Sequence, residues 1–140
     1  MAGMSIEDRL DVTDLVARYA ECVDTADVEG YASLFVPDGV VEQSAGSVKG
    51  REEIRAWVAD LAKQGRIGPE SHLKHVLGLP VIRGDGSRCT ARTYVVIPRM
   101  MESGEISTRL VGAYKDEIVK QDGRWLIEKR IIDLDFVAKG

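Results

Sequence analysis

Three short glycine turns divide the C-terminal half of this chain into long segments rich in strand-forming residues. The turns are Gly84-Asp85-Gly86, Ser103-Gly104 and Asp122-Gly123. Aspartate and glycine are typical of tight hairpin turns because they tolerate the positive φ angles that such turns require. A tight hairpin joins antiparallel neighbours, so this half of the chain is predicted to form an antiparallel meander.

The segments between these turns carry threonine, valine, isoleucine and tyrosine, which favour strands. A strand-like segment that precedes them contains Gly78 and Pro80, which predict a bulge or bend instead of a straight central strand. The predicted strands cover residues 72–83, 88–101, 106–120 and 124–136.

The N-terminal half has helical periodicity instead. Val12, Val16, Tyr19 and Val23 recur at spacings of three and four residues and form one apolar face. Ser5 is placed to cap this first helix. The predicted helices cover residues 5–24, a segment capped by Asp27 that runs to about Phe35, and residues 52–62.

The order of these elements predicts an α+β fold in a single domain over residues 1–140. A turn at Pro37-Asp38-Gly39, a short strand from residue 40 and a loop bracketed by Gly46 and Gly50 are expected between the second and third helices. Three helices cannot cover both faces of such a sheet. A curved sheet wrapped over the three N-terminal helices, with a pocket between them, satisfies the pattern better.

Composition and charge exclude several classes of function. The net charge of −4 provides no basic footprint for nucleic acid. No stretch approaches the roughly 18 apolar residues of a membrane helix, and no signal peptide is visible. We therefore expect a cytoplasmic protein that binds neither nucleic acid nor membrane.

The residues that usually mark metal or cofactor chemistry are sparse. Cys22 and Cys89 lack metal-ligand spacing and are expected to be buried, reduced thiols. Two cysteines and two histidines do not make a convincing zinc site. The chain also lacks a Gly-x-Ser-x-Gly motif, a phosphate loop and a dinucleotide fingerprint. No metal, cofactor or covalent nucleophile is expected.

Asp24 lies where the first predicted helix ends. It falls about 100° from Val23 around the helix axis, beside Ala17 and Ala20, at the margin of the buried face. A carboxylate at this margin could face a cavity and take part in proton transfer. The alternative is an acid at a helix end that caps the next helix.

Short motifs along nearly the whole chain resemble one family. They are Asp14-Leu15 with Arg18-Tyr19, Val23-Asp24, Tyr31-Ala32-Ser33-Leu34-Phe35 with Pro37-Asp38-Gly39, Gly50-Arg51 with Ile54, Gly112 with Tyr114 and Asp116, and Asp122-Gly123-Arg124-Trp125 followed by Arg130. In this order the motifs are similar to those of the SnoaL-like domains in the nuclear transport factor 2-like superfamily. The resemblance implies a cone-shaped barrel, in which a curved antiparallel sheet and three N-terminal helices enclose a pocket.

Within that superfamily the chain most resembles the branch of scytalone dehydratase and hexachlorocyclohexane dehydrochlorinase. The resemblance implies a catalytic pair formed by Asp24 and His75, assisted by the basic residue Arg130. Relatives often carry Asn where this chain has Leu79, a departure that removes a polar partner. Such a pair suits proton transfer, because the carboxylate orients the imidazole and stabilises its charged form.

Each candidate has an alternative role. Arg130 could pair with Asp24, Asp116 or Asp133 for structural reasons. Tyr19, Trp57 and Tyr94 are candidates for the pocket wall, but packing in the core is the favoured role of all three. His72 and His75 are three residues apart and would point to opposite faces of a regular strand, so only one of them is expected to face the pocket.

Three functions remain open. The first is a lyase or isomerase, of the dehydratase, dehydrohalogenase or polyketide cyclase type, that acts on a small hydrophobic cyclic molecule. The second is a non-catalytic binding or assembly domain, like the small subunits of ring-hydroxylating dioxygenases. The third is an epoxide hydrolase, which would need an Asp–Arg–Asp arrangement. A homodimer or homotrimer that buries the outer face of the sheet is expected in each case.

Overall fold

The computed structural model describes residues 3–139, so Met1, Ala2 and Gly140 of the predicted domain lie outside the described residues. The elements are α1 (Ile6–Thr25), α2 (Val28–Ser33), β1 (Phe35–Gln43), β2 (Gly46–Lys49), α3 (Arg51–Lys63), a 3₁₀ turn (Pro69–Ser71), β3 (Val76–Leu77), β4 (Val81–Gly84), β5 (Arg88–Met100), β6 (Ile106–Gln121) and β7 (Arg124–Val137). The three predicted helices and the meander of long strands are therefore present.

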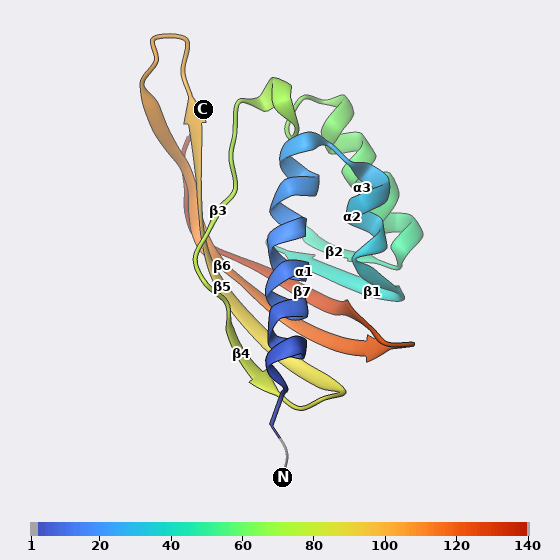
Figure 1. Ribbon diagram of the computed structural model, residues 1–140. Helices are drawn as coiled ribbons and strands as arrows, with labels where there is room; N and C mark the ends of the chain where they lie inside the picture. The colour runs from blue at the N-terminus through green and yellow to red at the C-terminus, as the bar shows by residue number, and fades with distance from the viewer. Residues whose placement is uncertain (1–2, 140) are drawn as a thin grey trace.

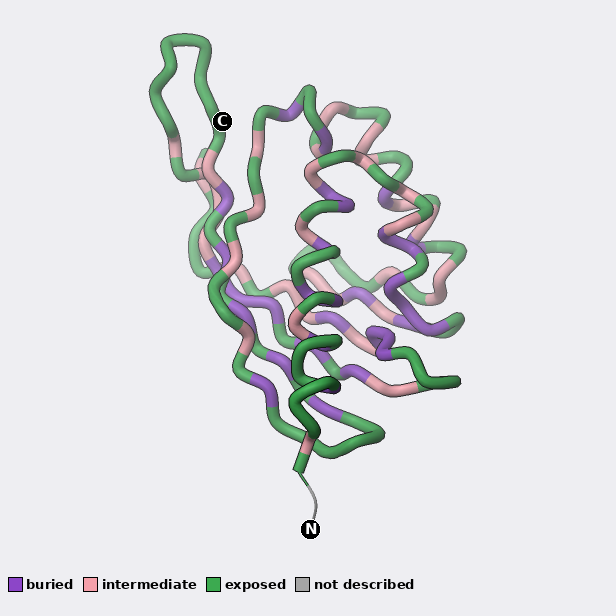
Figure 2. The backbone as a smooth tube through the Cα atoms, in the orientation of Figure 1, coloured by how far each residue is buried: buried purple, intermediate pink, exposed green. Residues whose placement is uncertain are grey.

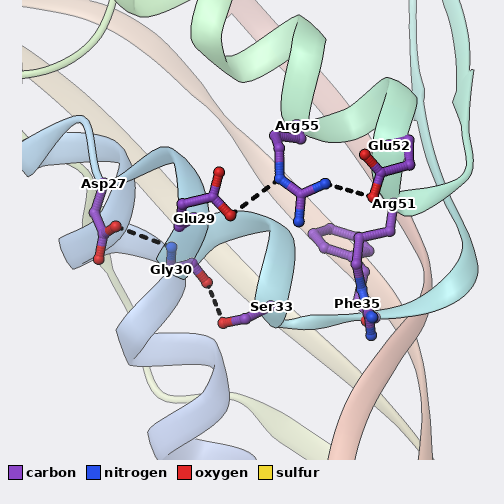
Figure 3. Close-up of polar contacts among 8 residues, drawn as sticks. All are labelled: Asp27, Glu29, Gly30, Ser33, Phe35, Arg51, Glu52 and Arg55. Atoms are coloured by element: carbon purple, nitrogen blue, oxygen red, sulfur yellow. Dashed lines mark hydrogen bonds and ion pairs between the residues drawn. The ribbon is translucent and has the colours of Figure 1, made fainter.

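Local capping sets the bounds of the first two helices. The Ser5 hydroxyl accepts a hydrogen bond from the backbone N–H of Asp8 at 3.0 Å, which confirms the predicted cap of α1. α1 ends at Ala26, which has a left-handed conformation with φ 56°. The Asp27 carboxylate then accepts from the N–H of Gly30 at 2.9 Å and caps α2 (Figure 3). The left-handed Ala26 and the Asp27 cap thus connect the two helices.

Two arginines fix α3 against α2 and β1 (Figure 3). Arg55 donates to the carboxylate of Glu29 on α2 at 3.0 Å and also to Glu52 on its own helix. Arg51 donates from Nε to the backbone carbonyl of Phe35 at 3.1 Å. These contacts hold the helix pair over the start of β1.

The seven strands form one sheet in the order β2-β1-β7-β6-β5-β3, and β4 also pairs with β5. β1 runs parallel to β7, whereas the other pairs are antiparallel. The predicted wholly antiparallel sheet was therefore wrong at this one pair. Parallel neighbours need a long crossover connection, and here α3 and the whole meander supply it.

Two short segments differ from the prediction. Pro37-Asp38-Gly39 lies inside β1, where the pairing with β7 shifts register between Phe35 and Val40, so a bulge replaces the predicted turn. Gly46–Lys49 is not a loop but the strand β2, joined to β1 by a hairpin in which Gln43 pairs with Gly46. Proline and glycine in a strand commonly mark a bulge, so the same residues suit either structure.

The helices cover one face of the curved sheet and leave the other face open (Figure 1). Figure 2 shows that buried positions follow the strands behind α1, while the far end of the β5–β6 hairpin is exposed. Alternation on β5 buries Cys89, Ala91, Val95 and Ile97 against the helices. Cys22 and Cys89 are buried free thiols, as predicted, and burial raises the pKa of Cys89 to about 11. Within residues 3–139, no helix is long and apolar enough to cross a membrane.

Candidate active site

Asp24 in the last turn of α1 and His75 just before β3 are joined by hydrogen bonds. Asp24 Oδ1 lies 2.8 Å from Nδ1 of the imidazole, within hydrogen-bond reach. The backbone N–H of His75 also donates to the carboxylate, at 3.1 Å from Oδ2 and 3.3 Å from Oδ1. One carboxylate thus holds both the ring and the main chain of the same histidine.

This contact assigns the roles of the two imidazole nitrogens. A carboxylate is an acceptor, so the neutral ring carries its proton on Nδ1, and Nε2 is the basic nitrogen. The His75 side chain is only 8% exposed and that of Asp24 15%. The Tyr19 ring packs edge-on to the imidazole, with centroids 6.2 Å apart at 85°. Carboxylate and aromatic ring together fix the orientation of the base.

His75 lies in the wall of a cavity of about 350 Å³, a volume suited to a small molecule. α1 and α2 contribute to one wall, α3 and the segment after it to a second, and β5, β6 and β7 to the third. Most of the lining side chains are apolar or aromatic. Beside His75 they include Tyr19, Val23, Tyr31, Trp57, Val58, Leu61, Ile67, Ile97, Leu110, Tyr114, Ile132, Leu134 and Val137.

Arg130 is fully buried and lies behind this wall, not in it. Its Nε and Nη2 donate to the two carboxylate oxygens of Asp116, each at 2.7 Å. Its guanidinium lies over the rings of Tyr19, at 3.8 Å from the centroid, and Tyr114, at 4.5 Å. Asp116 is thus the structural partner among the alternatives, and Arg130 is absent from the described residues that line the cavity.

The pKa values of the buried arginine and tyrosines are shifted by their surroundings. Burial by itself disfavours the charge on Arg130, but the close Asp116 carboxylate outweighs it and raises the pKa of the guanidinium. Burial raises the pKa of the Tyr31 and Tyr114 hydroxyls well above the ordinary value. Both tyrosines are therefore neutral hydroxyls at physiological pH.

A family model for the SnoaL-like domain matches residues 4–131, which is most of the chain. The chain belongs to the SnoaL-like domain family. Two solved structures share its fold. One is a protein with a cystatin-like fold from Nostoc punctiforme, with a TM-score of 0.83, 24% identity and 96% of each chain covered. The other is an NTF2-like protein with a cystatin-like fold from Novosphingobium aromaticivorans, with a TM-score of 0.82, 26% identity and 93% and 83% covered.

One relative carries a named function. The chain is 24% identical to the β 1 subunit of the terminal oxygenase component of terephthalate 1,2-dioxygenase from Comamonas sp.. The match covers 91% of this chain and 91% of that subunit. The SnoaL-like domain therefore has neighbours that include a subunit of a larger oxygenase.

The structure separates the predicted pocket residues of this SnoaL-like domain. Tyr19 and Trp57 line the cavity, but Tyr94 does not, so that prediction was wrong. Tyr94 is 67% exposed on the outer face of β5, where its ring contacts Arg92. Its neighbours Thr93 and Val95 point inward instead. Strand alternation put Tyr94 on the opposite face, and the sequence alone did not reveal which of the two faces is inward.

The two histidines are also separated, but not by strand alternation. His72 is exposed and has a left-handed conformation, φ 58°, at the end of the 3₁₀ turn. It lines an open hollow beside Glu70 and Arg99 instead of the cavity. The strand-like segment predicted over residues 72–83 contains two short strands, β3 and β4, and they are separated at residues 78–80, where a bulge or bend was expected.

Sequence reasoning missed several cavity residues of the SnoaL-like domain. Tyr31 and Tyr114 belong to the motifs that carried the family resemblance, and their motif positions were the signal that could have marked them. Arg66 and the C-terminal half of β7 carried no comparable signal. Among the described residues, no group of His, Cys, Asp and Glu side chains is arranged to hold a metal ion.

Proposed function

We propose that this SnoaL-like domain is a cofactor-independent lyase or isomerase that acts on a small hydrophobic cyclic molecule. The observation that carries the proposal is the 2.8 Å contact between Asp24 and His75 at the wall of a largely apolar cavity. We also propose that the domain belongs with the branch of scytalone dehydratase and hexachlorocyclohexane dehydrochlorinase.

The chemistry begins with a proton on a ring carbon of the substrate. His75 Nε2 takes this proton, and the resulting imidazolium is stabilised by the negative charge of Asp24. In an elimination, the electron pair of the broken C–H bond forms a double bond and expels hydroxide or halide from the neighbouring carbon; proton return from His75 to hydroxide yields water. In an isomerisation, the same proton returns to a different carbon. Neither route needs a covalent intermediate with the protein.

Arg130 has an indirect part in this proposal. Because its guanidinium is bonded to Asp116 and covered by Tyr19 and Tyr114, it is not offered to a departing anion. It instead keeps the two aromatic walls in place. We therefore assign proton transfer to His75 and its orientation to Asp24.

Replacing the proposed base is the direct test. His75→Gln is expected to lower turnover by about 10²–10⁴-fold, the usual contribution of general acid–base catalysis. Asp24→Asn should also lower the rate, because an amide carries no charge to stabilise the imidazolium. Turnover is screened with cyclic hydroxy-ketones and halogenated rings, and circular dichroism checks that each variant is folded.

His72→Gln is the matched control, because His72 is exposed and outside the cavity. It should leave turnover unchanged. Undiminished turnover in His75→Gln would sink the proposed mechanism.

A second function is favoured by one specific observation, the likeness to a terephthalate dioxygenase β subunit over 91% of both chains. In that case the domain would be a structural subunit that assembles with a larger oxygenase chain. Assembly would then be unaffected by His75→Gln, and no compound in the screen would turn over. The epoxide hydrolase alternative ranks lower, because Asp24 bonds to His75 and Arg130 to Asp116, which leaves no Asp–Arg–Asp set among these contacts.

A further inference from the structure

A second hollow adjoins the cavity that holds His75. It has a volume of about 490 Å³ and lies between the end of α3, the segment before β3 and the ends of β5, β6 and β7. Arg66, Leu110 and Val137 line both this hollow and the cavity. A molecule in the cavity could therefore extend past these three side chains into the hollow. We call the hollow the arginine rim.

The arginine rim is strongly cationic. Arg66, Arg99 and Arg109 line it, and no carboxylate side chain does so among the described residues. This is unusual in a chain whose net charge is −4. Arg109 already interacts with another group of the protein. Arg99 also lines the neighbouring hollow that contains Glu70. Arg66 is therefore the first candidate to hold an anion in the rim, and Arg99 the second.

Backbone geometry holds Arg66 at this boundary. α3 ends with the N–H of Gly65 donating to the carbonyl of Ala62 and the N–H of Arg66 donating to that of Leu61, both at 3.0 Å. Gly65 has φ +69°, the left-handed conformation that such a helix end requires. Leu61 itself lines the cavity. The helix terminus thus fixes Arg66 directly beside the apolar wall.

Arg99 approaches the rim from the sheet. It lies near the end of β5 and forms a bridge with Leu73, another residue of the rim. The two arginines thus come from different elements, Arg66 from the segment after α3 and Arg99 from β5. A guanidinium presents paired donors that match the two oxygens of a carboxylate.

We propose that the substrate carries a carboxylate on its hydrophobic ring system, with the ring in the cavity beside His75 and the carboxylate held by Arg66 and Arg99. This inference rests on the proposed function only in taking that cavity as the substrate pocket. It narrows the substrate class from hydrophobic cyclic molecules to cyclic carboxylic acids.

Calorimetric titration of the full chain with a matched pair of ligands tests this assignment. The probes are 1-naphthylacetic acid and its neutral amide, which share the same bicyclic ring. The acid is expected to bind roughly tenfold more tightly at low salt, a modest factor because the rim is open to solvent. The advantage should shrink as salt rises.

Four variants locate the effect. Arg66→Gln and Arg99→Gln should remove most of the preference for the acid and leave binding of the amide unchanged. Arg66→Lys should retain part of it, because the charge remains while the paired donors are lost. Arg124→Gln, at an exposed arginine that begins β7, is the matched control and should have no effect.

The outcomes separate this inference from the proposed function. His75→Gln should still prefer the acid, even if turnover is lost. Equal binding of acid and amide would overturn the inference, as would an equal loss in Arg66→Gln and Arg124→Gln. Failure of both probes to bind at millimolar concentration would overturn it as well.

Discussion

The buried charge of Arg130 is balanced at close range by a residue directly opposite it in the sheet. Asp116 on β6 and Arg130 on β7 are register partners, and neither side chain has any exposed surface. Removing two charges from water is expensive, and it is tolerated here through two short hydrogen bonds and two aromatic faces. Loss of one partner would leave the other charge buried and unpaired.

We therefore expect Asp116→Asn to destabilise the fold by roughly 3–5 kcal/mol, the usual effect of breaking a buried pair. The double variant Asp116→Leu with Arg130→Met should recover much of this loss, because no charge is then left in the core. Urea unfolding at neutral pH measures both. A single variant as stable as the wild type would contradict the account of the pair.

For individual residues, the candidate site was predicted from the family resemblance of the sequence motifs. The resemblance brought Asp24 and His75 together although they lie on different elements and 51 residues apart. Residue chemistry alone could not do so, because both residues also suit ordinary roles in capping and packing. The inward or outward direction of Tyr94 depended on which face of β5 meets the helices, and that is a tertiary property.

At the scale of elements, one carboxylate ties the start of α1 to the last two strands. Asp8 accepts from the indole Nε1 of Trp125 at 2.9 Å and from Nζ of Lys120 at 3.0 Å. These two hydrogen bonds, that of Trp125 first, lower the pKa of Asp8 below its ordinary value. An ionised side chain thus contributes to the attachment of the first helix to the sheet.

This attachment should depend on pH in a defined direction. A carboxyl whose pKa is lowered by folding stabilises the protein above its unfolded pKa, near 4, and loses that contribution as the pH falls through the folded value. Asp8→Asn should therefore be less stable than the wild type at pH 7, and the difference should narrow by pH 3. Thermal unfolding at both pH values measures it. If Asp8→Asn lowered the stability by the same amount at both pH values, the ionised Asp8 carboxylate would not be the cause.

Gly112 permits the close approach of β6 and β7 at a bulge. The pairing of the two strands shifts register between Val111 and Gly112. A Cβ at Gly112 would lie 2.3 Å from the backbone oxygen of Asp133 and 2.8 Å from Cα of Leu134, a residue of the cavity wall. A side chain there would push the strands apart.

Gly112→Ala is expected to destabilise the protein by about 1–3 kcal/mol, the range for overpacked sites. Gly78→Ala is the matched control, because its nearest neighbour would be the backbone oxygen of Tyr94 at 3.8 Å, an ordinary contact. Chemical denaturation compares the two. The prediction fails if the two alanine variants are equally stable.

Most elements were predictable because their signals are local. Caps at Ser5 and Asp27 and turns at residues 84–86 and 122–123 depend on residues close in sequence. The full extent of β1 could not be predicted from local signals. Pro37 and Gly39 are tolerated at a bulge only where a partner strand accepts the irregular pairing. That partner, β7, is distant in sequence and cannot be inferred from the residues of β1.

At the scale of the whole molecule, the helices leave the outer face of the sheet uncovered (Figure 1). Three large apolar residues on that face form an exposed patch: Tyr94 is 67% exposed, Phe136 49% and Val96 40%. Val96 and Phe136 both flank Val111 in the register of the sheet, so they are neighbours. A patch of this kind is typical of an interface.

We expect the protein to form a homodimer or homotrimer through the outer face of residues 88–136. Light scattering should give a multiple of the 15.4 kDa chain mass at micromolar concentration. Val96→Glu combined with Phe136→Glu should shift the mass to that of the monomer. Leu10→Glu, at an exposed apolar position on α1, should leave the mass unchanged. A monomeric wild-type protein would contradict this prediction.

The parallel pairing of β1 with β7 has a consequence for biosynthesis. The edge of β1 that faces β7 can form its backbone hydrogen bonds only after β7 has been made. Contacts between segments so distant in sequence form slowly, because chain entropy is lost before they are made. On the ribosome, the helices and β1 would emerge with an open, apolar strand edge, which is prone to aggregation. The native sheet is thus completed only after β7 has been synthesised.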